Sequence, residues 1–347
     1  MKQLFSIIMI FVMFLMLSIN VIGYSYSDYI NEINNAVESH EKAYKVDTLV
    51  YAENAIDAIQ NGDDLYYLDN QCNVYKINLL TRQQELLING ADIKVNHNNT
   101  IYKIDMTKVN TTPLRYNYYL YYNTINDTIA LVASFKATDE LTGNFVQPRY
   151  ENYELISVSI SVPDCKLLTY TTGAYSNNET NYRILGTINN KYFVIGNNGN
   201  LYLLNSINTN YIRKDYINSL QTLINYNFGY ESFINYNGNI YMSQHGKLFK
   251  YNYNNITNIY LSKENVTYST VKNNAFYIYI NETFIKTDFE LNQYYSFTVN
   301  DIYVADNLPL NLIEPTWEFT KLYISSKDDI VFYDLNTKTF RIIERRF

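Results

Sequence analysis

The hydrophobic pattern changes character within the first fifty residues. Residues 4–17 are almost wholly apolar, and residues 27–44 place Ile, Val and Tyr side chains at the spacing of one helical face, with Ser27 in position to cap it. From Thr48 onward, apolar residues occur in short runs separated by polar turns, and no window keeps a 3.6-residue period. The pattern predicts an apolar leader, one short helix and then a long all-β region.

One unit of strand, polar turn and strand recurs throughout the β region. Residues 64–78 contain the clearest copy, and residues 82–88 follow it as a third strand. Further copies lie at 191–205, 239–251 and 321–336, with more degenerate ones at 118–133, 153–170 and 275–299. Aligning their first strands gives seven units with a mean period of about 43 residues, which is typical of a radial array of small sheets.

This period predicts an all-β β-propeller of seven four-stranded blades, with six or eight blades as the alternatives. A β-helix needs shorter rungs, and a two-sheet sandwich does not repeat at this interval. The last unit lacks an outer strand, which residues 47–52 can supply by pairing with residues 339–344 and so closing the ring. The expected organisation is a signal peptide (1–23), a helical spacer (24–47) and a propeller domain (48–347).

The repeat motif also carries a resemblance. Units such as Leu65-Tyr66, a polar turn, and then the segment Val74 to Asn78 resemble the β-propeller repeats of secreted domains of unknown function, and more distantly other seven-bladed propellers. The resemblance covers residues 48–347 and implies an architecture without an activity, since propellers include enzymes, binders and scaffolds. The chain lacks the Trp-Asp dipeptide of WD40 blades, the paired glycines of kelch repeats and the Ser-x-Asp-x-Gly-x-Thr-Trp box of sialidases.

The leader has the features of a secretory signal. Lys2 supplies a short positive start, residues 4–17 form the apolar segment, and small or branched residues up to Gly23 suit cleavage. The alternative is an uncleaved anchor, because residues 4–23 are just long enough to span a bilayer. Asn20 and the short apolar run favour cleavage, so we expect a secreted or extracellular protein. Display on a cell surface or an envelope is the alternative, and membrane attachment is expected only if the leader is kept.

Seven Asn-x-Ser/Thr sequons suit a glycoprotein in such a compartment. The chain is so rich in Asn, Ser and Thr that chance alone produces a similar number, so the count itself shows no selection for glycans. Glycans are expected only at exposed sequons and in a eukaryotic host. The candidate sites are Asn98, Asn110, Asn126, Asn178, Asn255, Asn265 and Asn281.

Composition narrows the class of partner. The 347 residues are 47% hydrophobic and 18% charged, enough apolar material for a substantial core. Asp+Glu number 34 against 27 for Lys+Arg, a net charge of −7, and no basic run offers the surface that nucleic acid needs. The 38 tyrosines favour half-buried pleated surfaces, and most are expected to pack within the repeats.

The two cysteines, Cys72 and Cys165, would suit one disulfide in an oxidising compartment. The repeat alignment places them in equivalent turns of the first and third units, on one face of the ring with a blade between them. At that separation a bridge cannot form. We therefore expect two unpaired thiols.

Few residues point to metal binding or nucleophilic catalysis. The three histidines, His40, His97 and His245, are far apart in sequence and have no cysteine nearby, so no metal site is expected. The Asn- and Asp-rich turns at 61–64 and 327–329 offer oxygen ligands to calcium, although turn formation explains them without a metal. No Gly-x-Ser-x-Gly elbow and no glycine-rich phosphate loop occurs, so no cofactor is expected.

Carboxylates and tyrosine clusters remain as candidates for function. Inner strands could pair acids for glycoside hydrolysis, although solvated loop charges are the simpler interpretation; the candidates are Asp63, Glu151, Glu154, Glu231 and Glu314. The Tyr-rich segments 116–122 and 251–253 could present aromatic faces to a sugar or a protein.

These observations predict a monomeric, non-catalytic propeller that binds a protein or carbohydrate partner. One alternative is a propeller-fold glycosidase or lyase that acts on polysaccharide. Another is a structural protein of an envelope or particle.

Overall fold

A computed structural model divides the chain into two compact units, Met1–Ala43 and Tyr44–Phe347. The predicted leader and helix lie outside the described residues except at positions 42–44, where Tyr44 already belongs to a strand. The first strand thus begins four residues before the expected start of the propeller at 48. The structure describes residues 42–97, 100–103, 118–135, 154–174, 182–196, 201–205, 215–216, 232–244, 247–252, 256–257, 268–305, 307–308, 310 and 321–346.

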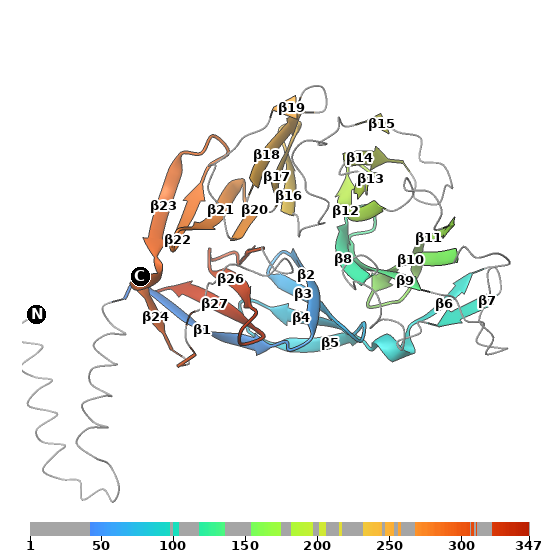
Figure 1. Ribbon diagram of the computed structural model, residues 1–347, viewed down its shortest axis with the longest axis horizontal. Coiled ribbons are helices and arrows are strands. Elements are labelled where there is room, and N and C mark those ends of the chain that lie inside the picture. Colours follow the sequence, from blue (N-terminus) through green and yellow to red (C-terminus); the bar gives the residue numbers. More distant parts are fainter. Residues whose placement is uncertain are drawn as a thin grey trace, which may run out of the picture. The chain divides into compact units, whose positions relative to one another are not determined.

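The described part of the second unit is built from β-strands and two short 3₁₀ turns, Gly90–Asp92 and Val299–Asp301 (Figure 1). Five sheets each contain four antiparallel strands in chain order. They are β2 (Ala55–Asn61), β3 (Asp64–Asp69), β4 (Val74–Asn78) and β5 (Gln84–Ile88); β8 (Tyr118–Asn123), β9 (Thr128–Phe135), β10 (Glu154–Val162) and β11 (Leu167–Ala174); β12 (Tyr182–Ile188), β13 (Lys191–Gly196), β14 (Leu201–Leu204) and β15 (Asp215–Tyr216); β16 (Ser232–Tyr236), β17 (Asn239–Gln244), β18 (Lys247–Asn252) and β19 (Ile256–Thr257); and β20 (Tyr268–Lys272), β21 (Ala275–Ile280), β22 (Thr283–Thr287) and β23 (Gln293–Thr298). A separate hairpin contains β6 (Lys94–His97) and β7 (Thr100–Lys103).

A five-stranded sheet, which we call the closing sheet, joins the two ends of this unit. Its order is β24 (Ile302–Val304), β1 (Tyr44–Tyr51), β27 (Thr339–Arg345), β26 (Ile330–Asp334) and β25 (Tyr323–Ile324). β1 pairs antiparallel with β27 from Tyr44 opposite Arg345 to Tyr51 opposite Thr339, which confirms the pairing predicted between 47–52 and 339–344. The parallel strand β24 then covers the outer edge of β1, a contact that the sequence pattern did not predict.

Neighbouring sheets share apolar clusters all the way around. The β2–β5 sheet packs on the β8–β11 sheet, which packs on β12–β15, while β16–β19 packs on β20–β23. The closing sheet packs on both β20–β23 and β2–β5. The remaining contact joins β12–β15 to β16–β19 through Phe193 and Phe233, whose ring centroids are 5.0 Å apart. Gly186 allows this approach, because a Cβ atom at position 186 would lie 2.7 Å from the Cζ of Phe233. The sheets form a closed ring, and the fold is a β-propeller.

The expected number of seven four-stranded blades is wrong. Among the described residues there are five four-stranded sheets and the five-stranded closing sheet. The error lies in the units at 118–133 and 153–170, which were aligned as two blades but supply β8 to β11 of a single sheet. The long connection between β9 and β10 separates the two hairpins in sequence, so that one blade has the spacing of two.

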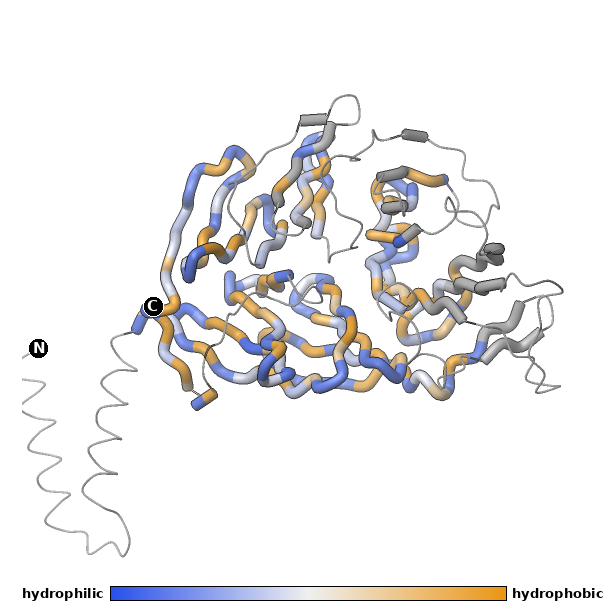
Figure 2. The backbone as a smooth tube through the Cα atoms, in the orientation of Figure 1, coloured by the Kyte–Doolittle hydropathy of each residue, from blue (hydrophilic) through white to orange (hydrophobic). Residues whose placement is uncertain are grey.

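Tyrosine packing between sheets explains much of the tyrosine excess. Apolar residues occur along all the sheets (Figure 2), and many of the buried positions are tyrosines. The hydroxyl of Tyr323 donates to the carbonyl of Ala58 at 3.3 Å, and that of Tyr333 donates to the carbonyl of Ala52 at 2.6 Å. A ring thus fills the space between two sheets while its hydroxyl meets a backbone group.

The cysteines are unpaired, as predicted, but not for the predicted reason. Cys72 lies in the turn between the second and third strands of its sheet, whereas Cys165 lies between the third and fourth strands of the next sheet. The two turns are therefore not equivalent, and successive turns of an antiparallel sheet lie at opposite ends. No blade separates the two sheets, which share one apolar cluster.

Candidate functional site

The inner strands of the ring bring together an acid and a base that the sequence pattern did not single out. Asp57 on β2 and Arg183 on β12 form an ion pair of 3.5 Å, with both side chains buried. The N–H of Leu120 on β8 donates to the same carboxylate at 2.7 Å, and the Arg183 guanidinium lies 4.8 Å from the ring centre of Tyr119. Burial raises the pKa of Asp57, while Arg183 and the backbone N–H groups act against that shift.

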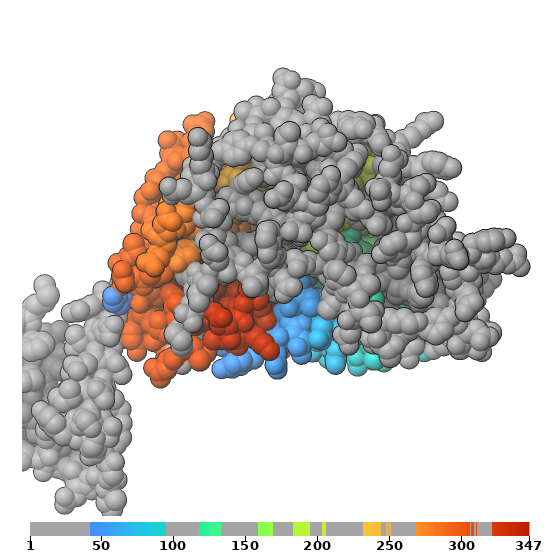
Figure 3. Space-filling model, viewed as in Figure 1, coloured from blue at the N-terminus to red at the C-terminus, as the bar shows by residue number. Residues whose placement is uncertain are grey.

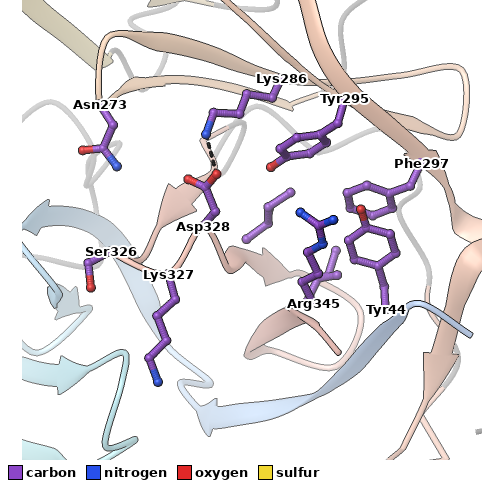
Figure 4. Close-up of a pocket in the computed structure, with 11 residues that line it drawn as sticks. Tyr44, Asn273, Lys286, Tyr295, Phe297, Ser326, Lys327, Asp328 and Arg345 are labelled. Carbon is purple, nitrogen blue, oxygen red and sulfur yellow. Dashed lines mark hydrogen bonds and ion pairs between the residues drawn. The ribbon is translucent and has the colours of Figure 1, made fainter. Parts of the chain in front are cut away.

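A cavity of about 400 Å³ lies elsewhere, between the β20–β23 sheet and the closing sheet. The space-filling view shows these two sheets, orange and red, meeting along one side of the molecule (Figure 3). Strands β22 and β23 supply one wall, β1, β26 and β27 supply the other, and the β20–β21 and β25–β26 turns complete the lining (Figure 4). We call this cavity the side pocket.

One wall of the side pocket is organised by strand register. Tyr277, Lys286 and Tyr295 lie directly opposite one another on β21, β22 and β23, so their side chains leave the same face of the sheet. The Lys286 ammonium lies 5.0 Å from the ring centre of Tyr277 and 5.7 Å from that of Tyr295. A cation held over two aromatic faces is favourable because it meets the negative face of each ring.

Asp328 completes this arrangement from the opposite sheet. It lies in the β25–β26 turn, where its carboxylate forms an ion pair with Lys286 (Figure 4). The same carboxylate accepts a 2.7 Å hydrogen bond from the Tyr277 hydroxyl. Burial, followed by the Asp328 carboxylate, raises the pKa of Tyr277. The Tyr277 hydroxyl therefore stays protonated, and the contact holds the two sheets together at the pocket.

The other wall presents a second cation beside aromatic rings. Arg345 lies directly opposite Tyr44 in the β1–β27 ladder, and the Tyr44 ring stacks on Phe297 with centroids 3.7 Å apart. The Arg345 guanidinium lies beside the Tyr44 and Tyr295 side chains (Figure 4), and its charge counteracts the rise in pKa that burial causes at both tyrosines. Among the described residues no ion pair joins Arg345 to a carboxylate, so its charge is available to a ligand.

The acids chosen from the sequence do not form a catalytic pair in the described structure. Asp63 lies in the β2–β3 turn and accepts a 2.6 Å hydrogen bond from the backbone N–H of Ser326. Glu154 is the first residue of β10 but its side chain is not described, and Glu151, Glu231 and Glu314 lie outside the described residues.

The turns considered for calcium use their carboxylates within the protein. Asp64 accepts from the Asn78 amide at 2.9 Å, Asp329 accepts from the Ser325 hydroxyl at 2.9 Å, and Asp328 is paired with Lys286. No cluster of three or more His, Cys, Asp or Glu side chains occurs within the described ranges. His97 lies on β6 without a described side chain, and His40 and His245 fall outside those ranges.

The tyrosine cluster at 116–122 is not an exposed aromatic face. Tyr118, Tyr119 and Tyr121 are buried in β8, Tyr122 is half-buried, and Tyr116 is not described. The cluster forms core because both faces of β8 pack against neighbouring sheets. In the second tyrosine-rich segment, 251–253, Tyr251 belongs to β18 but its side chain is not described. Tyr253 lies outside the described residues.

Two of the seven sequons fall on described residues. Asn126 lies in the β8–β9 turn and Asn281 in the β21–β22 turn, and both residues are exposed. The other five, Asn98, Asn110, Asn178, Asn255 and Asn265, lie outside the described residues.

The residues that line the side pocket are spread between positions 44 and 345 and share no local motif, so sequence spacing could not reveal them. One signal was present: the predicted pairing of residues 47–52 with 339–344 brings both ends of the β region into one sheet. In the structure this ladder continues outward to Tyr44, which lies opposite Arg345, a register that differs by two residues from the one the predicted ranges imply.

Comparisons with known proteins show no family for this chain. No family model matches the chain, and no curated protein matches it. Similar solved structures include the WD40 β-propeller domain of Doa1, at 8% identity and a TM-score of 0.44, covering 87% of this chain and 97% of that chain. Another is the computationally designed Ika8 protein, at 10% identity and a TM-score of 0.36, covering 85% and 98% respectively. At these TM-scores the fold assignment rests on the sheet topology, and no function is transferred.

The described part of the chain contains no helix with the length and apolar character of a membrane span.

Proposed function

We propose that this protein is a secreted or surface-displayed β-propeller that acts as a non-catalytic binding module for a protein or carbohydrate partner. The side pocket carries the proposal. It has the volume of a small-ligand site, and its lining combines aromatic rings with a few convergent polar groups. The apolar leader supports an extracytoplasmic location.

The residues of the inner strands favour a structural role for the ring centre over glycoside hydrolysis. Glycoside hydrolysis requires two carboxylates facing each other across the scissile bond. The six inner strands β2, β8, β12, β16, β20 and β25 carry one carboxylate within their described bounds, Asp57, and that residue is buried in an ion pair. The side pocket also holds one carboxylate, which pairs with Lys286.

Binding through the side pocket can be tested with two adjacent tyrosines. Tyr295 lines the pocket, whereas Tyr294 is 62% exposed and points to the other face of β23. Immobilised wild-type protein is screened against a panel of oligosaccharides and extracellular proteins, and each hit is re-measured with Tyr295→Ala and Tyr294→Ala. We expect hits that Tyr295→Ala weakens at least tenfold and Tyr294→Ala leaves within twofold. Hits that respond equally to both variants, or no hits at all, would refute the proposal.

A further inference from the structure

We propose that the side pocket binds an acidic saccharide, whose carboxylate or sulfate is held by Arg345 and whose ring lies against the aromatic wall. This inference rests on the proposed binding function and adds the chemical class of the ligand. It follows from the charges of the pocket, from its aromatic lining and from the pairing of the strand that carries Tyr44.

The side pocket is positive in a protein that is negative overall. Three cationic side chains, Lys286, Lys327 and Arg345, line it together with one carboxylate, Asp328. Asp328 is engaged by Lys286, and no ion pair joins Arg345 or Lys327 to a carboxylate among the described residues. The chain as a whole has a net charge of −7, so this local excess of positive charge favours an anionic ligand.

Arg345 is the better placed of the two remaining cations. Its guanidinium lies among Tyr44, Tyr295 and Phe297, whereas the Lys327 side chain extends away from these rings (Figure 4). A guanidinium presents a planar fork of N–H donors that matches a carboxylate or a sulfate. An anion bound there also lies beside the Tyr295 hydroxyl, which burial keeps protonated and able to donate.

The rest of the lining suits a sugar. Partly exposed rings of Tyr44 and Tyr295 provide apolar surface for the C–H face of a pyranose. The Asn273 amide and the Ser326 hydroxyl lie on the opposite side of the pocket and can exchange hydrogen bonds with sugar hydroxyls (Figure 4). Aromatic faces at one end and polar groups at the other match the two kinds of surface on a saccharide.

An acidic peptide is the weaker alternative. Peptides that dock beside a sheet commonly add a strand to a free edge. β1, which carries Tyr44, is already paired on both sides, with β27 and with β24. A peptide main chain therefore cannot pair with β1 at the pocket, and among the described strands that line it the edge strand β23 is the one to which a peptide could add.

The test uses ligands that differ in charge and variants that are matched in charge. The purified full chain is titrated calorimetrically with tetragalacturonate, its fully methyl-esterified counterpart, a heparin-derived tetrasaccharide and tetraglutamate. Arg345→Gln and Lys327→Gln each remove one positive charge from exposed residues of the pocket lining. Thermal unfolding of both variants confirms that the fold is kept.

We expect at least one of the two acidic saccharides to bind. If tetragalacturonate binds, its uncharged methyl ester should bind at least tenfold more weakly. Arg345→Gln should weaken binding about ten- to a hundredfold, because it removes a charge-assisted hydrogen bond, and Lys327→Gln should weaken it less than threefold. Raising the salt concentration from 0.05 to 0.5 M should weaken binding of the wild type more than that of Arg345→Gln.

Three results would overturn the inference. If the methyl ester binds as well as tetragalacturonate and Tyr295→Ala abolishes both, the pocket is a binding site but not one for acidic sugars, and the proposed function stands. If tetraglutamate alone binds and depends on Arg345, the ligand is an acidic peptide. If neither acidic saccharide binds, the ligand class is wrong, and the panel screen with Tyr295→Ala then decides the proposed function separately.

Discussion

Asp57 and Arg183 form a buried ion pair between strands of two sheets that do not neighbour each other in the ring. The inner strand β8 of the intervening sheet joins them, since Leu120 donates its N–H to Asp57 and the Tyr119 ring lies under Arg183. Three consecutive sheets are thus tied at their inner strands by one carboxylate. The sequence pattern missed this pair because each residue stands alone among apolar neighbours and nothing in the spacing links positions 57 and 183.

Replacing Asp57 with Ala should destabilise the protein strongly. Arg183 would be left buried without its counter-ion, which typically costs about 3–5 kcal/mol in the free energy of unfolding. Chemical denaturation of the variant checks the cost. Asp57→Ala combined with Arg183→Met should recover part of the loss, because the uncompensated charge is removed. A single variant as stable as wild type would show that the ion pair does not hold the sheets together.

Truncating Val46 should weaken the closure of the ring. Val46 is fully buried on β1 within the cluster that joins the closing sheet to β20–β23. Val46→Ala should lower the free energy of unfolding by about 2 kcal/mol, through lost burial and a residual cavity. Tyr51, on the same strand but 69% exposed, is the matched control, and Tyr51→Ala should change stability by less than about 0.5 kcal/mol. Equal effects of the two substitutions would mean that β1 is not packed as described.

The two thiols should react with iodoacetamide very differently. Burial, with Asp69 nearby, raises the pKa of Cys72 to about 12, and burial also raises the pKa of the partly exposed Cys165. A raised pKa lowers the thiolate fraction, so at pH 8 only about one Cys72 thiol in ten thousand is ionised, and each further pH unit should raise that fraction tenfold up to about pH 11. Peptide mapping of the native protein at pH 8 should find Cys165 alkylated first, whereas both react in guanidinium chloride. Faster labelling of Cys72 would contradict its burial.

Glycan attachment should occur at Asn126 and Asn281 when the full chain is expressed through a eukaryotic secretory pathway. Both sequons lie in exposed turns, where the transferase can reach the asparagine side chain. Enzymatic deglycosylation followed by peptide mass spectrometry should show conversion of both asparagines to aspartate. Asn126→Gln should remove one glycan and leave thermal stability unchanged, because Asn126 is exposed and does not have a positive φ. Unmodified peptides at both positions from secreted protein would refute this prediction.

The sequence was most informative where local pattern and topology coincide. Short apolar runs separated by polar turns predicted strands such as β3, β4 and β26, and the missing outer strand of the last unit predicted that β1 pairs with β27. The number of blades failed because the period was measured across the connection between β9 and β10, whose length does not depend on the fold.

Interactions that depend on several sheets at once could not be predicted. Tyr277, Lys286 and Tyr295 become one surface only through the register of three strands, and Asp328 reaches them from another sheet. The tyrosine cluster at 116–122 shows that composition alone does not tell whether a strand is exposed. Its composition suggested an exposed recognition face, but a strand with a neighbouring sheet on each side has no exposed face to offer.

Hydrogen–deuterium exchange with and without a saturating acidic tetrasaccharide tests binding in the side pocket most directly. The account predicts slower exchange of backbone amides in β22, β23 and β27 and in the β25–β26 turn. The β2–β5 sheet should not change, except near Asp63, which accepts a hydrogen bond from Ser326 in the β25–β26 turn. At a ligand concentration near the wild-type dissociation constant, the same protection should be several-fold smaller in Arg345→Gln. Protection that falls on other sheets, or that persists unchanged in the variant, would contradict the assignment of the side pocket as the binding site.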